Sequence, residues 1–145
     1  MPVSGREVSL AVQRMLAAAT TRSCGYGTAP TVSSTPSGAQ VPYSVLYPLG
    51  VTTDGPPYGE ADADARVLLQ LTSVAATAEQ AEWMADKVRS VMLGRKTSGA
   101  YTSEITVPGC VVMQRTLDKE EGVAVASGVY SYVQRYVIEV TTLNT

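Results

Sequence analysis

The stretch LTSVAATAEQAEWMADKV, residues 71–88, constrains the fold more than any other part of the sequence. It starts with the end of an alternating apolar pattern, typical of a strand, and continues within a few residues as an amphipathic helix pattern. Thr77 and Gln80 have the spacing of a capping box, and Gly94 follows the last apolar position of the helix. The small side chains of Ala81 and Ala85 favour close packing on a sheet. The segment therefore predicts a strand followed by a helix that covers it.

The remaining patterns predict one more helix and several more strands. Residues 3–19 have apolar side chains at helical spacing, with Ser4 as the N-cap and Glu7 completing a second capping box. Strand patterns cover residues 41–47, 66–74, 105–107, 110–115 and 129–141. A break is expected after residue 47, and TLDKEEG, residues 116–122, is expected to form a charged turn. The chain is therefore predicted to be α+β, with one mixed or antiparallel sheet of about four strands and two helices packed on one face.

The length of 145 residues favours a single domain, spanning residues 1–145. Residues 20–40 are rich in Thr, Ser, Gly and Pro, which predicts a flexible loop or arm. The net charge of −2 argues against a protein that coats nucleic acid, because phosphate neutralisation needs a basic surface. No apolar run approaches ~18 residues, and the first residues lack a signal-peptide pattern. We therefore expect a cytosolic product without a membrane span.

The absence of histidine is the composition value that bears most on chemistry. It removes the commonest general base and the commonest metal ligand. Cys24 and Cys110 lie far apart in the sequence and not at metal-ligand spacing; two separate thiols are favoured, and a disulfide stays open. No G-x-S-x-G motif is present. The sequence predicts a protein that is not an enzyme and has no cofactor or metal site.

The aromatic residues allow two interpretations each. Tyr130, Tyr132 and Tyr136 fall on one face of the last strand pattern, where they could stack on bases as in an RNA-binding sheet. Only Arg135 is nearby, on the opposite face, so packing under a helix or at a subunit interface is favoured. Trp83 lies about a quarter turn away from the apolar stripe of its helix. It is expected either at the edge of the core or in an exposed contact.

Four segments together resemble the tail terminator proteins of long-tailed, siphovirus-type bacteriophages. They are VPYSVLYPLG (residues 41–50), DGPP (54–57), RVLLQLTSVAATAEQAEWMADKVRSVMLG (66–94) and SGVYSYVQRYVIEV (127–140). The resemblance spans roughly residues 41–140. Its motifs describe architecture, and the family has no catalytic motif to transfer.

The resemblance implies a virion protein of the tail or neck that is assembled in the host cytoplasm. Such a subunit forms a homo-hexameric ring on the completed tail tube and stops polymerisation of the major tail tube protein. The ring then presents a surface to the head–tail connector or neck protein, and DNA passes through it without specific binding. No cofactor and no membrane are implied.

Contacts of such a ring are expected on hydrophilic loops that project from paired strands. The residues predicted to make them are Asp54, Tyr58, Trp83, Arg115, Asp118, Lys119, Glu120 and Glu121. Three alternatives stay open: another connector or neck protein that completes the head, a small-ligand or nucleic-acid-binding module, and a cryptic hydrolase.

Overall fold

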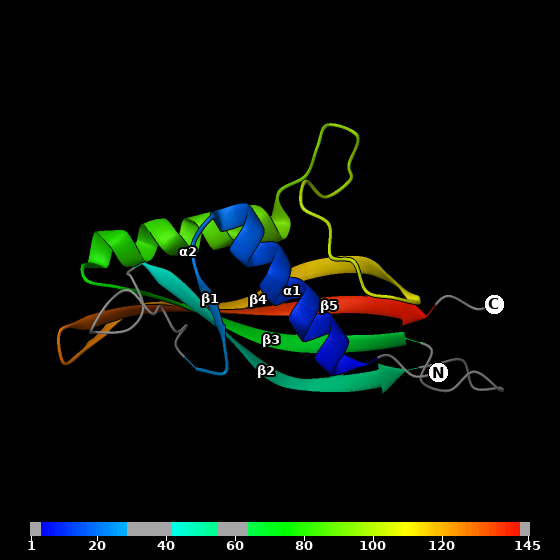
Figure 1. Ribbon diagram of the computed structural model, residues 1–145, viewed down its shortest axis with the longest axis horizontal. Coiled ribbons are helices and arrows are strands. Elements are labelled where there is room, and N and C mark those ends of the chain that lie inside the picture. The colour runs from blue at the N-terminus through cyan, green and yellow to red at the C-terminus, as the bar shows by residue number, and fades with distance from the viewer. Residues whose placement is uncertain (1–3, 29–41, 55–63, 143–145) are drawn as a thin grey trace.

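A computed structural model describes residues 4–28, 42–54 and 64–142 of the chain (Figure 1). Within them lie two helices and five strands: α1 (Gly5–Thr20), β1 (Cys24–Tyr26), β2 (Tyr43–Asp54), β3 (Asp64–Ala75), α2 (Ala78–Leu93), β4 (Cys110–Ala126) and β5 (Val129–Thr142). The strands form one sheet in the order β1-β2-β3-β5-β4. β1 pairs in parallel with β2, and the other pairs are antiparallel. Both helices lie on the same face, so the predicted α+β class and the helix placement are confirmed.

Both helices begin at the predicted caps. The Ser4 hydroxyl accepts a hydrogen bond from the Glu7 amide at 3.3 Å, and the Thr77 hydroxyl accepts one from the Gln80 amide at 3.2 Å. Gly94 ends α2, but in an extended conformation and not in the left-handed one typical of a helix C-terminus. Glycine is needed there for space, since a Cβ atom at this position would collide with the Ser90 carbonyl oxygen.

β2 is longer than predicted, because the segment expected to break after residue 47 continues as a strand to Asp54. A β-bulge between Pro48 and Gly50 absorbs the irregularity. The bulge tolerates the proline, which cannot donate to the ladder, and Gly50 supplies a φ of 131°. β2 and β3 therefore form a long antiparallel pair.

β1 lies inside the region that we predicted to be a loop or arm, residues 20–40. Cys24–Tyr26 pairs with β2 at Ser44, Val45 and Leu46, and the Gln13 side chain of α1 donates to the Cys24 carbonyl at 2.8 Å. This short strand raises the number of strands to five from the expected four or so. The prediction for residues 29–41 falls outside the described residues.

The predicted charged turn at residues 116–122 is wrong, since these residues lie within β4. The chain reverses later, at Ser127 and Gly128 between β4 and β5. Two bulges, at Leu117/Lys119 and at Glu120/Gly122, fit the charged segment into the strand. Gly122 has a φ of 76°, so the glycine that suggested a turn belongs to a bulge.

The predicted strand at residues 105–107 is also absent: these residues have no strand pairing. Ile105 and Val107 are nevertheless buried and belong to the core. Apolar alternation therefore identified burial correctly but not the backbone conformation.

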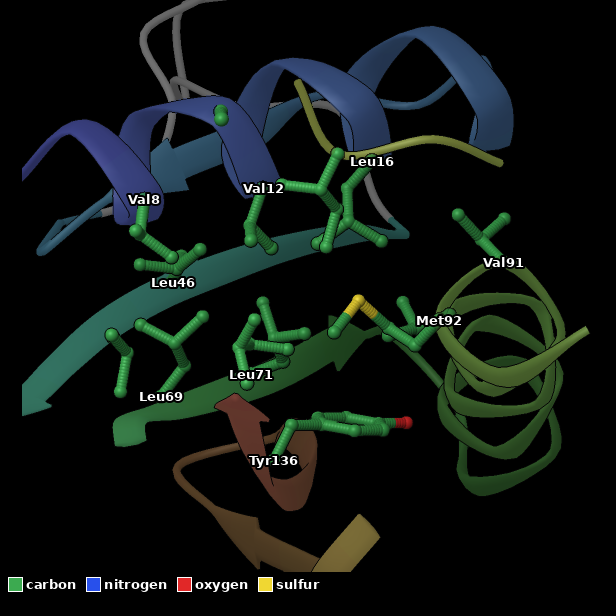
Figure 2. Packing of buried hydrophobic residues seen from close by; sticks show 14 of the residues in the cluster. Val8, Val12, Leu16, Leu46, Leu69, Leu71, Val91, Met92 and Tyr136 are labelled. Atoms are coloured by element: carbon green, nitrogen blue, oxygen red, sulfur yellow. The ribbon is translucent and has the colours of Figure 1, made fainter. Parts of the chain in front are cut away.

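The core lies between the two helices and the sheet (Figure 2). Val8, Val12 and Leu16 of α1 face Leu46 of β2, and Met92 of α2 lies near Leu71 of β3. Tyr136, Ile138 and Val140 of β5 are fully buried on the same face, as the period of two predicts. Cys24 and Cys110 are both free thiols. Neither described helix is long and apolar enough to cross a membrane.

Candidate interaction surfaces

The acidic and basic side chains at residues 118–121 are divided between the two faces of the sheet. Glu120 pairs in register with Gln134, which shares the helix-covered face with Tyr136. Lys119 pairs with Arg135 on the opposite face. The contact cluster expected from the sequence is therefore two separate groups.

No described helix covers the second face, which we call the open face. It presents Arg66, Leu68 and Gln70 of β3 and Arg135, Val137 and Glu139 of β5, the alternate positions to the buried ones. Asp118 reaches this face and lines a hollow of about 240 Å³ with Thr52, Arg66, Leu68 and Val137.

Three cations of the open face lie near carboxylates. Arg66 lies 3.7 Å from Glu139, Arg135 lies 3.5 Å from Glu121, and Lys119 lies 3.7 Å from the same Glu121 carboxylate. These pairs are solvent-exposed and add little stability. Their consequence is electrostatic, because each of these three cations lies near one of two glutamate carboxylates.

On the helix-covered face, Glu120 of β4 connects α2 with β5. Its Oε1 atom accepts hydrogen bonds from Arg89 Nε at 2.9 Å and from Gln134 Nε2 at 2.8 Å. Gln134 Nε2 also donates to the Ala85 carbonyl at 3.2 Å, and Arg89 donates to Asp86 at 2.7 Å. α2, β4 and β5 are therefore joined by one polar network.

The network changes the ionisation of its members. Burial alone would raise the pKa of Glu120, but hydrogen bonds from Gln134 and Arg89 outweigh it and lower this pKa. The hydrogen bond with Glu120 raises the pKa of Arg89. Burial raises the pKa of nearby Tyr136, whose hydroxyl has no hydrogen-bond partner among the described residues.

Glu120→Gln is expected to reduce the dependence of stability on pH. Because the pKa of Glu120 is lower in the folded chain, its contribution is present above the unfolded-state value near 4.5 and is lost as pH falls through the folded value. At pH 7 the variant should lose about 1 kcal/mol of unfolding free energy, and the difference from the native chain should shrink at acid pH. Urea unfolding at several pH values measures this.

Glu121→Gln is the matched control for the Glu120 substitution. Its side chain is 42% exposed and pairs with exposed cations, so the change should cost less than about 0.5 kcal/mol at any pH. Parallel pH profiles for the native chain and the Glu120 variant would contradict the role given to the Glu120 network.

Trp83 lies on the outer side of α2 and is 49% exposed, which rules out the core edge as its place. Lys87 Nζ lies 4.9 Å from the centre of its ring. Trp83 borders a hollow of about 640 Å³ between α2 and the chain before β2. The residues that line this hollow are Arg22, Pro42, Ala76, Thr77, Glu79, Gln80 and Trp83. An exposed tryptophan beside a hollow has the composition of a protein-contact site.

Arg115, expected among the contact residues, is instead buried, with 5% of its surface exposed. Its guanidinium donates to the Met92 carbonyl in the last turn of α2, at 3.1 Å, and to the Ser103 carbonyl. The Tyr101 ring lies between the guanidinium groups of Arg115 and Arg95, each 4.2 Å from its centre. Burial lowers the pKa of Arg115. The residue holds the loop after α2 against β4.

The other two predicted contact residues lie at the end of β2. Asp54 is the last residue of that strand and pairs with Asp64. Tyr58 falls outside the described residues. The structure therefore places Trp83, Glu120 and the group of Asp118, Lys119 and Glu121 on three separate surfaces.

Sequence reasoning missed a set of apolar side chains exposed along the outer strands: Leu49, Val51, Val111 and Met113. Leu49 and Val51 lie in the part of β2 that was expected to be a break. The run VTT at residues 51–53 is β-branched throughout, a signal that could have extended the strand prediction.

Among the described residues there is no group of three or more Cys, Asp or Glu side chains that could hold a metal ion. No protein-family model matches the chain, and no curated protein sequence matches it.

Proposed function

We propose that this chain is a structural assembly protein, the tail terminator of a siphovirus-type bacteriophage. It acts by forming a ring on the end of the completed tail tube, which blocks further addition of tube protein. The opposite side of the ring then receives the head connector.

The resemblance in sequence is the first support, and three of its four segments map onto a continuous part of the described fold. Residues 41–50 contribute most of β2, residues 66–94 contribute β3 and α2, and residues 127–140 contribute β5. These elements are neighbours in space, since β3 pairs with both β2 and β5 and α2 packs against β3 and β5. The resembling residues therefore make up the centre of the subunit.

The observation that carries the proposal is a sheet with open boundaries. Helices cover one face, no described element covers the other, and β4 is an outer strand of 17 residues. Exposed apolar side chains lie on β2 and on β4, toward the two opposite edges of the sheet. Monomeric proteins usually protect long outer strands, so such edges favour a subunit that is completed by its neighbours.

The paired cations of the open face support the passage of DNA without binding. Retention of DNA needs unpaired cations aimed at phosphates. Arg66, Lys119 and Arg135 each lie near a glutamate instead. A ring surface of this composition would let DNA slide past.

Deletion of the gene from the phage that encodes it tests the function. The expected result is overlong tails without heads, measured as the tail-length distribution in electron micrographs, with normal length restored by a plasmid copy. Tails of normal length with leaking heads would contradict the terminator function and favour a neck protein that completes the head.

A further inference from the structure

The two outer sides of the sheet, beside β2 and beside β4, have complementary features. Leu49 and Val51 on β2 are 43% and 41% exposed, and Val111 and Met113 on β4 are 44% and 51% exposed. β1 pairs with β2 only as far as Leu46, so among the described residues no strand pairs with the outer side of residues 47–54. The two exposed apolar groups, one on β2 and one on β4, therefore lie at opposite edges of the sheet, where no described strand adds to the ladder.

A pocket of about 440 Å³ lies beside β4, between this strand and the loop that precedes it. Its lining is mainly apolar and comprises Ala100, Tyr101, Glu104, Ile105, Thr106, Val107, Cys110, Val111, Val112 and Arg115. The Tyr101 hydroxyl accepts a hydrogen bond from the Arg115 amide at 3.0 Å, so the loop closes over β4 at this point. Up to Arg115, β4 thus offers an apolar hollow in place of a bare strand edge.

Val51 lies on the same face of the sheet as Val112 and Arg115 of the pocket. Val111 also lines the pocket, but its register with Thr141 places it on the open face. Val51 pairs with Val67, Val67 with Ile138, and Ile138 with Arg115. Val51 contacts α1, since a Cβ atom on Gly5 would collide with it. Val112 and Arg115 face the helix-covered side as well, being in register with Val140 and Ile138. A neighbouring copy in the same orientation would bring Val51 level with the pocket.

Strand direction favours the same arrangement. Three successive antiparallel pairings separate β2 from β4, so the two strands run in opposite directions. Two copies placed side by side in one orientation would therefore bring β4 of one against β2 of the next as antiparallel neighbours. Antiparallel pairing is the commoner and slightly more stable form.

We propose that the β2 side of one copy, through Leu49 and Val51, docks into the β4 pocket of a second copy. The contact is heterologous, because each copy uses different surfaces on its two sides. Repetition by rotation closes a ring of subunits that lie side by side. The proposal specifies the contact within the ring of the proposed function and needs no other phage component.

Two substitutions, Leu49→Asp and Val111→Asp, test the contact by complementation. Each places a charge on one side of the contact and leaves the other side intact. In native mass spectrometry the native chain should form a ring, and each variant alone should be a 15.3 kDa monomer with no heavier species. A mixture of the two should form a mixed dimer, in which the intact β2 side of one meets the intact pocket of the other.

Val125→Asp is the control, because this exposed β4 residue lies outside the contact and its substitution should leave the ring intact. Circular dichroism melting verifies that all three variants are folded. Rings from either test variant, or no mixed dimer from two folded variants, would overturn the contact. Monomeric test variants that form the mixed dimer, together with tails of normal length in the deletion phage, would instead overturn the proposed function alone.

Discussion

Arg115→Ala is expected to lower the free energy of unfolding by about 3 kcal/mol, estimated from two lost hydrogen bonds to a charged donor. The Arg115 guanidinium donates to the Met92 and Ser103 carbonyls, which lie 23 and 12 residues away in the sequence. Met92 is in the last turn of α2, where carbonyls lack partners within the helix and the dipole favours a cation. The truncation would leave a carbonyl buried without a partner.

The effect of Arg115→Ala should be local as well as global. Without the guanidinium, the Tyr101 ring keeps Arg95 as its cation partner, and the loop between α2 and β4 loses the hydrogen bond from Arg115 to the Ser103 carbonyl. Hydrogen exchange should therefore become faster in residues 95–107 before the rest of the molecule opens. Urea unfolding measures the first effect and exchange mass spectrometry the second.

Two variants control for the loss of charge and the loss of ring stacking. Arg115→Lys keeps the charge but cannot reach two carbonyls with a planar fork, so it should recover only part of the stability. Arg95→Ala removes exposed contacts to Gly99 and Tyr101 and should cost less than about 1 kcal/mol. Equal stability of the Arg115→Ala variant and the native chain would contradict the role assigned to the guanidinium.

Met84→Ala is expected to cost about 2–5 kcal/mol, because truncation of a buried methionine removes apolar contacts and leaves a cavity. Met84 is fully buried in the core between α2 and the sheet. Folded domains have only about 5–15 kcal/mol of stability, so the variant should lose a large part of it. The midpoint of urea unfolding measures the change.

Trp83→Ala is the matched control, one residue away on the outer side of α2. Its ring is half exposed and its contact with Lys87 contributes only about 0.5–1 kcal/mol at such a site. The variant should fold like the native chain. A cost for Trp83→Ala as large as for Met84→Ala would contradict the orientation of the helix.

The central part of the fold could be predicted because its signals are local. The N-caps at Ser4 and Thr77 and the period of two in β5 depend on residues a few positions apart. Covering of one face by both helices follows from the apolar stripes. Each of these predictions is confirmed.

The outer strands were harder to predict because bulges imitate turns. Pro48 and Gly50 in β2, and the charged run ending at Gly122 in β4, have turn composition but occur in register shifts of long strands. Their pairing partners are distant in sequence. β1 was missed for a different reason: three residues are too few to show a period.

The candidate site was predicted only in part. Trp83 is exposed as one of its two interpretations required, and Lys119 and Glu121 lie near each other. Whether these residues make contacts stays a prediction. Glu120 was not separated from them because residues 116–122 were expected to form a turn. In β4, Lys119 and Glu120 pair with Arg135 and Gln134 on opposite faces, as strand alternation requires. Arg115 is buried by partners that no local pattern shows.

The length of tail tubes polymerised in the presence of the purified protein tests the central claim most directly. The measurement uses the major tail tube protein of the same phage and electron micrographs of its tubes. The proposal predicts that tubes stop growing when the protein is added and that one end is closed by a ring. Tubes of unchanged length without density at their ends, with the protein in excess, would contradict it.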